Sequence, residues 1–364
     1  MWTPKTTESI PLIRIRDLNP GTGTKTNFQG EFDPQFLVNR GDLLIGMDGE
    51  FRCNIWNGPE ALLNQRVCRL QNFSEKLFPK FLFYGINKYL KEIEDVTGFT
   101  TVKHLSSKSI KAITFPIPPL SEQERIVGIL DEAFEGIAAA TAQAEKNLHN
   151  ARELFQSVLQ STFSPKGDDW VEKTLKEMAK EFGRGKSKHR PRNADFLYGG
   201  QYPFVQTGDI RNSDHLITKY SQTYSEEGLA QSKLWPEGTV CITIAANIAE
   251  TGILNFDACF PDSVIGMIPD PEKSIGGYIE YLLQFFKVEL QRQGKGSAQD
   301  NINLGTFKDQ TFPFAPVNKQ QAIVEKLDAL SEETKRLETI YERKQSTLAE
   351  LKQSLLQKAF AGEL

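Results

Sequence analysis

The stretch FPIPPLSEQERIVGILDEAF at residues 115–134 recurs as FPFAPVNKQQAIVEKLDALS at residues 312–331, an offset of 197 residues. The match continues without gaps to Phe163 and Phe360. Self-similarity at a fixed offset is the signature of a repeat, so the chain is two copies of one unit, each a globular part followed by a helical part. Further pairs are RGDLLIGM at 40–47 with EGTVCITI at 237–244 and, at an offset of 192, PLIRIRDL at 11–18 with PFVQTGDI at 203–210.

Both repeated stretches open a long helical pattern. From residue 121 to 163, apolar or small side chains recur in steps of four and three, and the second copy repeats that register. Such a narrow stripe indicates a coiled-coil seam. The seam residues that we expect are Ile126, Leu130, Ile137, Leu154 and Val158 in the first copy, and Ile323, Leu327, Leu337, Tyr341, Leu348, Leu351 and Leu355 in the second.

The two helices are expected to pack on each other, antiparallel, within one chain. The first seam is alanine-rich at its centre where the second carries Leu337 and Tyr341, so that small side chains can face large ones. A helix of about 43 residues is roughly 65 Å long at 1.5 Å per residue. The alternative is that each helix covers its own globular domain, although a narrow stripe suits a facing helix better than a sheet.

The globular parts are expected to be α+β domains without a regular βαβ alternation. The domains that we expect are residues 1–114 and 164–317, with the long helices at 115–163 and 318–364. The expected strands are Leu12 to Arg16, Leu43 to Met47, Arg66 to Leu70, Phe204 to Thr207, Val240 to Ala245 and Val264 to Ile268, and the expected helices are about Pro79 to Glu94 and Ile275 to Arg292.

The two copies differ in length at their amino ends. The second copy has a further module at about 170–202 before Pro203, whereas ten residues precede Pro11 in the first copy. We therefore expect that roughly 23 residues are absent from the first copy, through natural loss, a clipped chain or a misplaced start.

Composition is that of an ordinary globular protein, with 39% hydrophobic and 25% charged residues. No stretch approaches the roughly 18 to 20 apolar residues of a membrane span, and the amino end shows no secretory signal, so we expect a cytoplasmic protein without a membrane partner. The four cysteines have no metal-ligand spacing, and we expect buried, reduced thiols and no bound metal.

A dense basic run lies between the expected helix and strand of the second domain. Its five cations alternate over nine residues with no acid among them, beside His189. Such a run repels itself unless an anion is near, which favours contact with phosphates; a solvated loop is the alternative. The cations are Arg184, Lys186, Lys188, Arg190 and Arg192.

Polar loops supply the remaining candidates for nucleic-acid contact. Lysine, hydroxyl, glutamine and asparagine side chains on a glycine-bearing loop can reach phosphates and base edges, because Gln or Asn pairs with adenine and Arg or Lys with guanine. An ordinary polar turn is the alternative. The second-copy candidates are Gln206, Thr207, Arg211, Lys295, Ser297, Gln299 and Asn301, and the first-copy candidates are Arg14, Arg16, Lys25, Thr101, Lys103 and His104.

Motifs for catalysis are missing, and we expect no catalytic residues. FGRGKS at 182–187 ends like a phosphate loop, but the partner glycine position holds Lys180. No G-x-S-x-G or H-E-x-x-H occurs, and Pro261-Asp262 has no [DE]-x-K downstream for a nuclease-like metal site. The [ND]-P-P-[YFW] motif and the glycine-rich cofactor loop of an adenine methyltransferase are also absent.

The sequence shows a specific pattern over essentially the whole chain, in which two variable domains are each followed by a long helix. The helices begin with FPIPPLSEQERIVGILD or FPFAPVNKQQAIVEKLD and end with LFQSVLQSTF or LKQSLLQKAFAGEL. The chain closely resembles the DNA-specificity subunit of type I restriction-modification systems. It departs from that family in the first domain, which lacks the counterpart of residues 170 to about 200, including the basic run.

The resemblance implies a subunit that is not itself an enzyme. Each domain would be a target-recognition domain that reads one half of a bipartite site in double-stranded DNA. The helices would form an antiparallel coiled coil that sets the spacer and docks two methyltransferase subunits, which methylate adenine with S-adenosylmethionine; this chain would bind no cofactor. Restriction and translocase subunits could join them. The alternatives are a coiled-coil scaffold without DNA specificity and a fragment of a fused restriction-methylation enzyme.

Overall fold

The computed structural model describes residues 5–19, 21–98, 103–164, 169–189, 191–245, 248–295, 304–305, 307 and 310–364. The side chains of residues 5–8 and 293–295 are outside this description. The chain divides into unit 1, residues 1–145 with 343–364, and unit 2, residues 146–342, and each unit combines one globular part with segments of both long helices.

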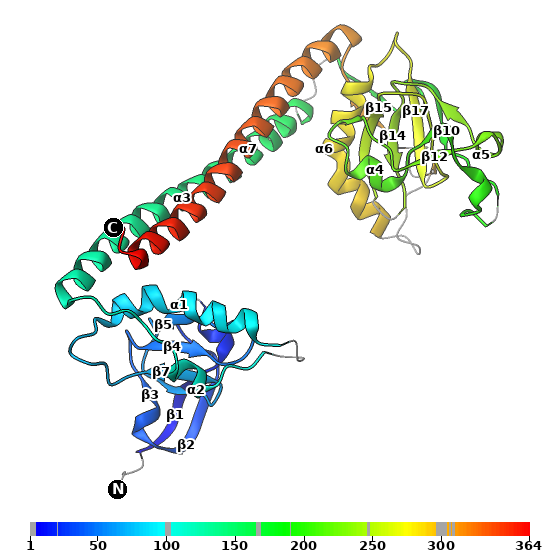
Figure 1. Ribbon diagram of the computed structural model, residues 1–364. Helices are drawn as coiled ribbons and strands as arrows, with labels where there is room; N and C mark the ends of the chain where they lie inside the picture. Colours follow the sequence, from blue (N-terminus) through cyan, green and yellow to red (C-terminus); the bar gives the residue numbers. More distant parts are fainter. Residues whose placement is uncertain are drawn as a thin grey trace. The chain divides into compact units, whose positions relative to one another are not determined.

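Unit 1 is built on two small sheets and a helix (Figure 1). Successive side chains of the central strand lie on opposite faces of the sheet. Leu43 and Ile45 pack toward the helix, with Ile86 and Leu90, whereas Leu44 packs in a second cluster. The strand orders are β2-β1-β6-β3 and β5-β4-β7. The strands are β1 (Lys5–Ile13), β2 (Asn27–Phe32), β3 (Leu37–Val38), β4 (Leu43–Gly46), β5 (Cys53–Ile55), β6 (Ala61–Leu63) and β7 (Val67–Leu70), and the helices are η1 (Ile15–Asp17), η2 (Pro34–Phe36), α1 (Pro79–Val96), α2 (Ser107–Lys111) and α3 (Leu120–Phe163).

Unit 2 repeats this plan with more strands. Val240 and Ile242 pack on the helix side of the large sheet, and Cys241 packs on the other side beside Trp235 and Phe260. The strand orders are β11-β15-β14-β17-β9, β12-β10-β16-β13 and β18-β8. The strands are β8 (Val171–Lys173), β9 (Ala179–Arg184), β10 (Tyr198–Phe204), β11 (Leu216–Ile217), β12 (Gln222–Tyr224), β13 (Leu234–Trp235), β14 (Val240–Thr243), β15 (Thr251–Leu254), β16 (Ala258–Cys259), β17 (Val264–Pro269) and β18 (Phe312–Phe314), and the helices are η3 (Asp195–Leu197), α4 (Thr207–Arg211), α5 (Glu226–Ala230), α6 (Gly276–Lys295) and α7 (Val317–Ala361).

The predicted elements are confirmed where the apolar pattern is strong, but two predicted strands end early. The strand expected to reach Arg16 ends at Ile13, and the one expected to reach Thr207 ends at Phe204. In both copies an aspartate, Asp17 or Asp209, accepts a hydrogen bond from the backbone N–H three residues before it. This capping interaction begins a short helix in place of the strand.

The long helices α3 and α7 run over the expected residues, and in each unit they bury apolar side chains on one face. In unit 1, Leu130 packs with Ala359, and the Lys352 ammonium lies 5.0 Å from the Phe134 ring. In unit 2, the Arg152 guanidinium pairs with the Glu338 carboxylate at 2.7 Å. Of the predicted stripe residues, Ile126, Leu130, Ile137 and Leu327 are buried, and Val158, Ile323, Leu337, Tyr341, Leu348 and Leu355 are half-buried.

The prediction is wrong for two residues of the coiled-coil seam. Leu154 and Leu351 are 52% and 46% exposed. After Ala151, Phe155 is the residue that packs in the core of unit 2. A straight α-helix has 3.6 residues per turn, so its buried face drifts from a strict 3.5-residue repeat. The stripe therefore passes to Phe155, one residue beyond the predicted position.

A buried glutamine joins the globular part of unit 1 to α3. Gln123 is fully buried, and its Nε2 donates to the carbonyl oxygens of Lys76 at 2.7 Å and Pro118 at 2.8 Å. Its Oε1 accepts the backbone N–H of Phe78 at 2.8 Å. The side chain therefore satisfies three backbone groups in the connection on either side of α1.

Unit 2 has the same joint at the positions 197 residues later. Gln320 is also fully buried; its Nε2 donates to the carbonyls of Lys273 at 3.0 Å and Ala315 at 2.8 Å, and its Oε1 accepts the N–H of Ile275 at 3.1 Å. Because the duplicated glutamine makes the same three hydrogen bonds, each copy fixes its globular part on its helix in the same local way.

Aromatic side chains complete both joints. In unit 2 the Tyr281 hydroxyl donates to Asp328 of α7 at 2.7 Å, and the equivalent Tyr84 hydroxyl donates to Asp131 of α3 in unit 1. The final phenylalanine of the other long helix packs on the same surface, with Phe360 at 4.9 Å from the Phe81 ring. Each globular part is therefore held by the start of one long helix and the end of the other.

A buried ionic cluster stabilises the turn after α4 in unit 2. His215 Nδ1 lies 2.7 Å from the carboxylate of Glu280, which is 1% exposed and also accepts a hydrogen bond from Thr251 at 2.9 Å. Burial disfavours the charged imidazole, but the hydrogen bond and charge of Glu280, with a contribution from Asp328, outweigh it and raise the pKa of His215. The cationic form of His215 is therefore favoured in the folded unit.

Among the described residues, no helix is long and apolar enough to cross a membrane. Across the same part of the chain, no three histidine, cysteine or acidic side chains gather into a possible metal site.

Candidate nucleic-acid interface

The basic run begins at the edge of the large sheet of unit 2. β9 pairs with β17, and the next residue, Gly185, donates its N–H to the Val264 carbonyl at 2.9 Å. A Cβ at Gly185 would lie 2.3 Å from the Phe260 carbonyl oxygen, so only glycine fits here. This close approach fixes the point where the run leaves the sheet.

Beyond Gly185 the side chains alternate between solvent and protein. Lys186 and Lys188 are exposed, whereas Ser187 between them is buried. In the described part of the chain, neither lysine ammonium forms an ion pair, so both remain able to meet a phosphate. Arg190 lies outside the described residues.

The two arginines that flank the lysines have a protein partner. Arg184 Nε donates to the Asp262 carbonyl at 2.7 Å, and the Arg192 guanidinium pairs with the Asp262 carboxylate at 2.7 Å. The run contains no acid of its own, but the fold brings Asp262 beside both arginines, and the Asp262 carboxylate pairs with Arg192. The acid comes from the turn before β17, which is distant in the sequence.

A second group of candidates surrounds the start of α4. Gln206 precedes the helix, and its side-chain amide donates to the Gln222 side chain at 2.8 Å. Thr207 is half-buried, and Arg211 at the end of α4 is exposed. The fold thus brings Gln206, Thr207 and Arg211 together on one short helix beside β12.

An exposed aromatic side chain was missed by the sequence analysis. Phe196 in η3 is 55% exposed, and the edge of its ring meets the His189 imidazole at 5.0 Å between centroids. An exposed aromatic beside basic residues can stack on bases. The signal in the sequence was an isolated phenylalanine four residues after the basic run.

Most of the predicted residues on the polar loop after α6 lie outside the described residues. Lys295 ends α6, with its side chain outside the description, and Ser297, Gln299 and Asn301 lie outside the described residues. Thr101 in the first copy does so as well.

In unit 1, three of the candidate side chains have acidic or backbone partners. Arg14 pairs with Asp17 at 3.1 Å. Burial opposes ionisation of Asp17, but hydrogen bonds from the Arg14 side chain and backbone hold its pKa below the ordinary value. Lys103 Nζ donates to the Glu94 carbonyl at 2.7 Å, and His104 pairs with Asp48.

Arg16 and Lys25 are exposed. In the described parts of unit 1, no carboxylate pairs with either of them. These two cations are therefore exposed and have no acidic partner in those parts of unit 1.

Comparison with known proteins identifies this arrangement of two copies. A family model described as the type I restriction modification DNA specificity domain matches residues 4–148 and 167–345. The chain belongs to this family. The specificity subunit of the type I restriction enzyme EcoBI from Escherichia coli is 26% identical, over 98% of this chain and 80% of the relative. The MjaVIII specificity subunit from Methanocaldococcus jannaschii is 25% identical, over 88% of this chain and 79% of the relative.

Solved structures of the specificity family share the fold. The HsdS subunit from Thermoanaerobacter tengcongensis superposes with a TM-score of 0.63 at 18% identity, covering 100% of this chain and 94% of that one. A chain from a study of complex assembly and conformational transition of the type I R-M system gives 0.77 at 19% identity, covering 100% and 95%. The resemblance inferred from the helical motifs is thereby confirmed.

Proposed function

We propose that this chain is the DNA-sequence-recognition subunit of a type I restriction-modification complex and has no catalytic activity of its own. The observation that carries the proposal is the double match to a DNA-specificity domain, with each copy held on the long helices by the same buried glutamine joint. Two similar but unequal readers in one chain suit a bipartite, asymmetric DNA site.

The chemistry belongs to partner subunits in this proposal. Two methyltransferase subunits methylate adenine with S-adenosylmethionine, and restriction and translocase subunits cleave and move DNA. This chain supplies binding and selection: phosphate contacts fix its position, and side chains at base edges choose the sequence.

The long helices act as the spacer in this proposal. An antiparallel coiled coil of α3 and α7 keeps the two readers at a set separation and offers the methyltransferase subunits a docking surface. The contacts of Leu130 with Ala359 and of Arg152 with Glu338 support antiparallel pairing. Leu154 and Leu351, exposed on the helices, are available to such partners.

The exposed lysines of unit 2 are proposed to bind the DNA backbone. Lys186 and Lys188 lie on a segment that Gly185 fixes to the sheet, and the next residue but one after Ser187, His189, contacts the exposed Phe196. Arg192 is assigned a supporting role, because the Asp262 carboxylate already neutralises part of its charge, and Arg184 is assigned one because its Nε already donates to the Asp262 carbonyl. Gln206 and Arg211 are the proposed base-reading candidates at α4.

A domain exchange tests the proposal. Residues 164–317 are replaced by the same segment of another specificity subunit, the chain is reconstituted with its methyltransferase subunits, and methylated adenines are mapped on genomic DNA. One half of the recognised site is expected to change while the other half is retained. The reciprocal exchange of residues 1–114 is the control and should change the other half. Methylation without sequence preference, or an unchanged site after both exchanges, would contradict the proposal.

A further inference from the structure

The imidazole of His215 joins the turn after α4 to two helices of unit 2. Its Nδ1 lies 2.7 Å from the Glu280 carboxylate of α6, and its ring stacks on Tyr281 of the same helix with 4.8 Å between centroids. Its Nε2 lies 3.9 Å from the Asp328 carboxylate of α7. The backbone carbonyl of His215 also accepts the Ile253 N–H of β15 at 2.9 Å. One residue therefore fastens this turn to the sheet, to α6 and to α7.

The backbone of His215 has a conformation that residues other than glycine rarely adopt. Its φ is 68°, in the left-handed region, where the Cβ crowds the backbone. Such a conformation persists where the surrounding contacts hold it. The carboxylate that receives the imidazole is itself fixed, because Glu280 is 1% exposed and its other oxygen accepts hydrogen bonds from Thr251 at 2.9 Å and Gln284 at 2.7 Å. The ion pair is therefore one of the contacts that hold the turn in place.

The turn that His215 holds follows directly on α4, which carries candidate base-reading residues at both ends. α4 is five residues long, and a helix of that length is not stable by itself. At its end, the Ser213 hydroxyl donates to the Ile210 carbonyl at 2.7 Å, two residues before His215. Movement of this turn would therefore move α4 and, with it, Gln206 and Arg211.

Charged groups on α6, on α7 and in the turn itself surround the imidazole. Glu280 on α6 and Asp328 on α7 favour its protonated form, whereas Lys335 on α7 opposes it. The Lys335 ammonium is paired at 2.8 Å with the carboxylate of Asp214, the neighbour of His215 in the turn. Burial lowers the pKa of His215, but the hydrogen bond and the charges of the two carboxylates raise it by more. Loss of the proton is therefore expected above about pH 6.5.

Three further charged groups line the cavity of about 270 Å³ beside the ring. Glu250, just before β15, and Lys287 of α6 pair with each other at 2.8 Å, so that their charges largely cancel. Arg211 of α4 is the third. The charge of the ring therefore also acts on a candidate base-reading side chain across this cavity.

Unit 1 has a permanent charge at the equivalent aspartate. Asp131 is the counterpart of Asp328, 197 residues earlier, and it pairs with the Lys80 ammonium at 2.6 Å. The position of Lys80 is held in unit 2 by Gly277 of α6, so that helix supplies no cation at this position. A lysine stays charged over the pH range in which a histidine titrates. Lys80 lies on α1, so its ion pair does not involve η1, the short helix that corresponds to α4.

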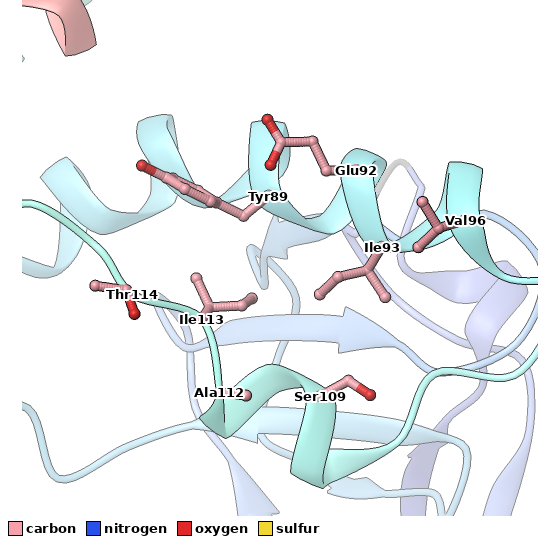
Figure 2. A pocket seen from close by; sticks show the side chains of 8 residues that line it. All are labelled: Tyr89, Glu92, Ile93, Val96, Ser109, Ala112, Ile113 and Thr114. Atoms are coloured by element: carbon pink, nitrogen blue, oxygen red, sulfur yellow. The ribbon is translucent and has the colours of Figure 1, made fainter.

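The other side of α1 also differs from the polar cavity at His215. A groove of about 610 Å³ lies between α1 and residues 109–114, and Ile93, Val96 and Ile113 are among the side chains that line it (Figure 2). The described residues around this groove include one carboxylate and no histidine. The contacts of α1 with these residues therefore do not depend on the protonation of an imidazole.

We propose that His215 is a positioning residue for sequence recognition by unit 2: its protonated imidazole fastens the end of α4 to α6 and α7, and loss of the proton loosens the presentation of Gln206 and Arg211 to DNA. This inference rests on the proposed function, because it takes α4 as a base-reading element. Loss of the proton removes the attraction of the ring to Glu280 and Asp328. Recognition by unit 2 then weakens as the pH rises, through a group that has no equivalent at the aspartate of unit 1.

The test uses the full chain reconstituted with its methyltransferase subunits. One duplex carries the recognised site, and a second has one base pair changed in the half-site that the exchange of residues 164–317 assigns to unit 2. The ratio of the two affinities is measured from pH 6 to 9 at fixed salt, so that phosphate contacts common to both duplexes cancel. The variants are His215→Gln, which removes the titrating group, and His215→Lys, which supplies a permanent cation. The control is His149→Gln, at an exposed histidine of α3.

With the unchanged chain, the affinity ratio is expected to fall by about three- to tenfold between pH 6 and pH 9, since one unit of raised pKa corresponds to a tenfold change. His215→Gln is expected to give the low ratio at every pH. His215→Lys is expected to keep the high ratio at pH 9, and His149→Gln to behave as the unchanged chain. A loss of stability alone would leave the ratio as it is, because the folded fraction is the same for both duplexes.

The same ratio measured for the half-site of unit 1 separates the two units. Unit 1 has a histidine of its own, His104, which contacts Asp48, so this ratio is compared between chains at each pH. The unchanged chain and His215→Gln are expected to agree there. An equal effect of His215→Gln on both half-sites would overturn the assignment to unit 2.

An equal fall of the unit 2 ratio in the unchanged chain and in His215→Gln would overturn the positioning role of His215, as would a ratio that does not change with pH. Lack of sequence preference at every pH would instead contradict the proposed function. Hydrogen exchange of residues 206–216 in the full chain without DNA then tests the ion pair alone. Protection relative to the intrinsic exchange rate is expected to be about three- to tenfold higher in the unchanged chain than in His215→Gln at pH 6, and equal protection would overturn the inference.

Discussion

The buried glutamine joints allow a quantitative test of how each globular part is fixed to its helix. In Gln320→Ala, two donated hydrogen bonds and one accepted bond are lost, and three backbone groups in a fully buried site lose their partners. At about 1 kcal/mol for each bond, the free energy of unfolding of unit 2 should fall by about 3 kcal/mol. The predicted fall in melting temperature is about 6 to 12 °C, at about 2 to 4 °C per kcal/mol for a unit of this size.

The assay is differential scanning calorimetry of the full chain with each variant. Gln123→Ala is expected to lower the transition of unit 1 by a similar amount, because that glutamine makes the same three bonds. The neighbouring Gln321 is exposed and bonds only to Glu325 within its own helix, so Gln321→Ala is the matched control. Its effect should stay within about 0.5 kcal/mol.

If unit 2 of the Gln320→Ala variant melted at the same temperature as that of the Gln321→Ala control, the reasoning would be refuted. That result would mean that the three backbone groups find other hydrogen-bond partners at no cost in free energy. The assignment to units has its own check. If Gln123→Ala and Gln320→Ala lowered the same transition, the joints would not act within their own units.

Three further predictions concern protonation, DNA binding and spacing. The pKa of His215 is raised in the folded unit, so the stabilising contribution of the charged imidazole is complete below about pH 6.5 and is lost as the pH rises through the folded pKa. Thermal melts from pH 6 to 9 should therefore show that unit 2 loses stability. His215→Gln should flatten this pH dependence of stability, whereas the control His149→Gln should not. The double variant Lys186→Ala, Lys188→Ala should reduce the slope of log affinity against log salt by about 1.8 in DNA titrations of the reconstituted complex, at about 0.9 per phosphate contact, whereas Lys326→Ala on α7 should leave it unchanged. Deleting residues 139–145 and 343–349 removes one heptad from each helix, about 10 Å, and should shorten the spacer between methylated half-sites by about three base pairs; methylation maps with the parental spacer would count against the helices as the ruler.

The helices and central strands could be predicted because their signals are local and repeated. The register of α3 and α7 follows from apolar spacing, and the strands around Leu43 and Val240 follow from continuous apolar runs. The early ends of the strands at Ile13 and Phe204 could not be read in the same way. They depend on Asp17 and Asp209, whose side chains cap a helical turn that apolar spacing does not reveal.

The residue types of the candidate interface could be predicted from the sequence, but the hydrogen bonds and ion pairs of those residues could not. The density of cations from 184 to 192 is visible in the sequence, and Lys186 and Lys188 are exposed as a contact segment requires. The bonds from Asp262 to Arg184 and Arg192 form because the fold brings a turn from seventy or more residues away to the edge of the sheet. Phe196 was missed for the same reason, since its exposure is decided by tertiary packing.

The contrast between what the copies share and what they vary bears on specificity. Asp17 and Asp209 occupy equivalent positions and make the same backbone hydrogen bond, because both short helices need it. The residue three positions earlier differs between the copies: it is arginine in one and glutamine in the other, Arg14 and Gln206, and the Arg14 side chain also bonds to Asp17. Arginine suits guanine and glutamine suits adenine at base edges. A fold that fixes the capping aspartate while changing the side chain at the cap can present different chemistry from one backbone, as the proposed reading of an asymmetric site would require.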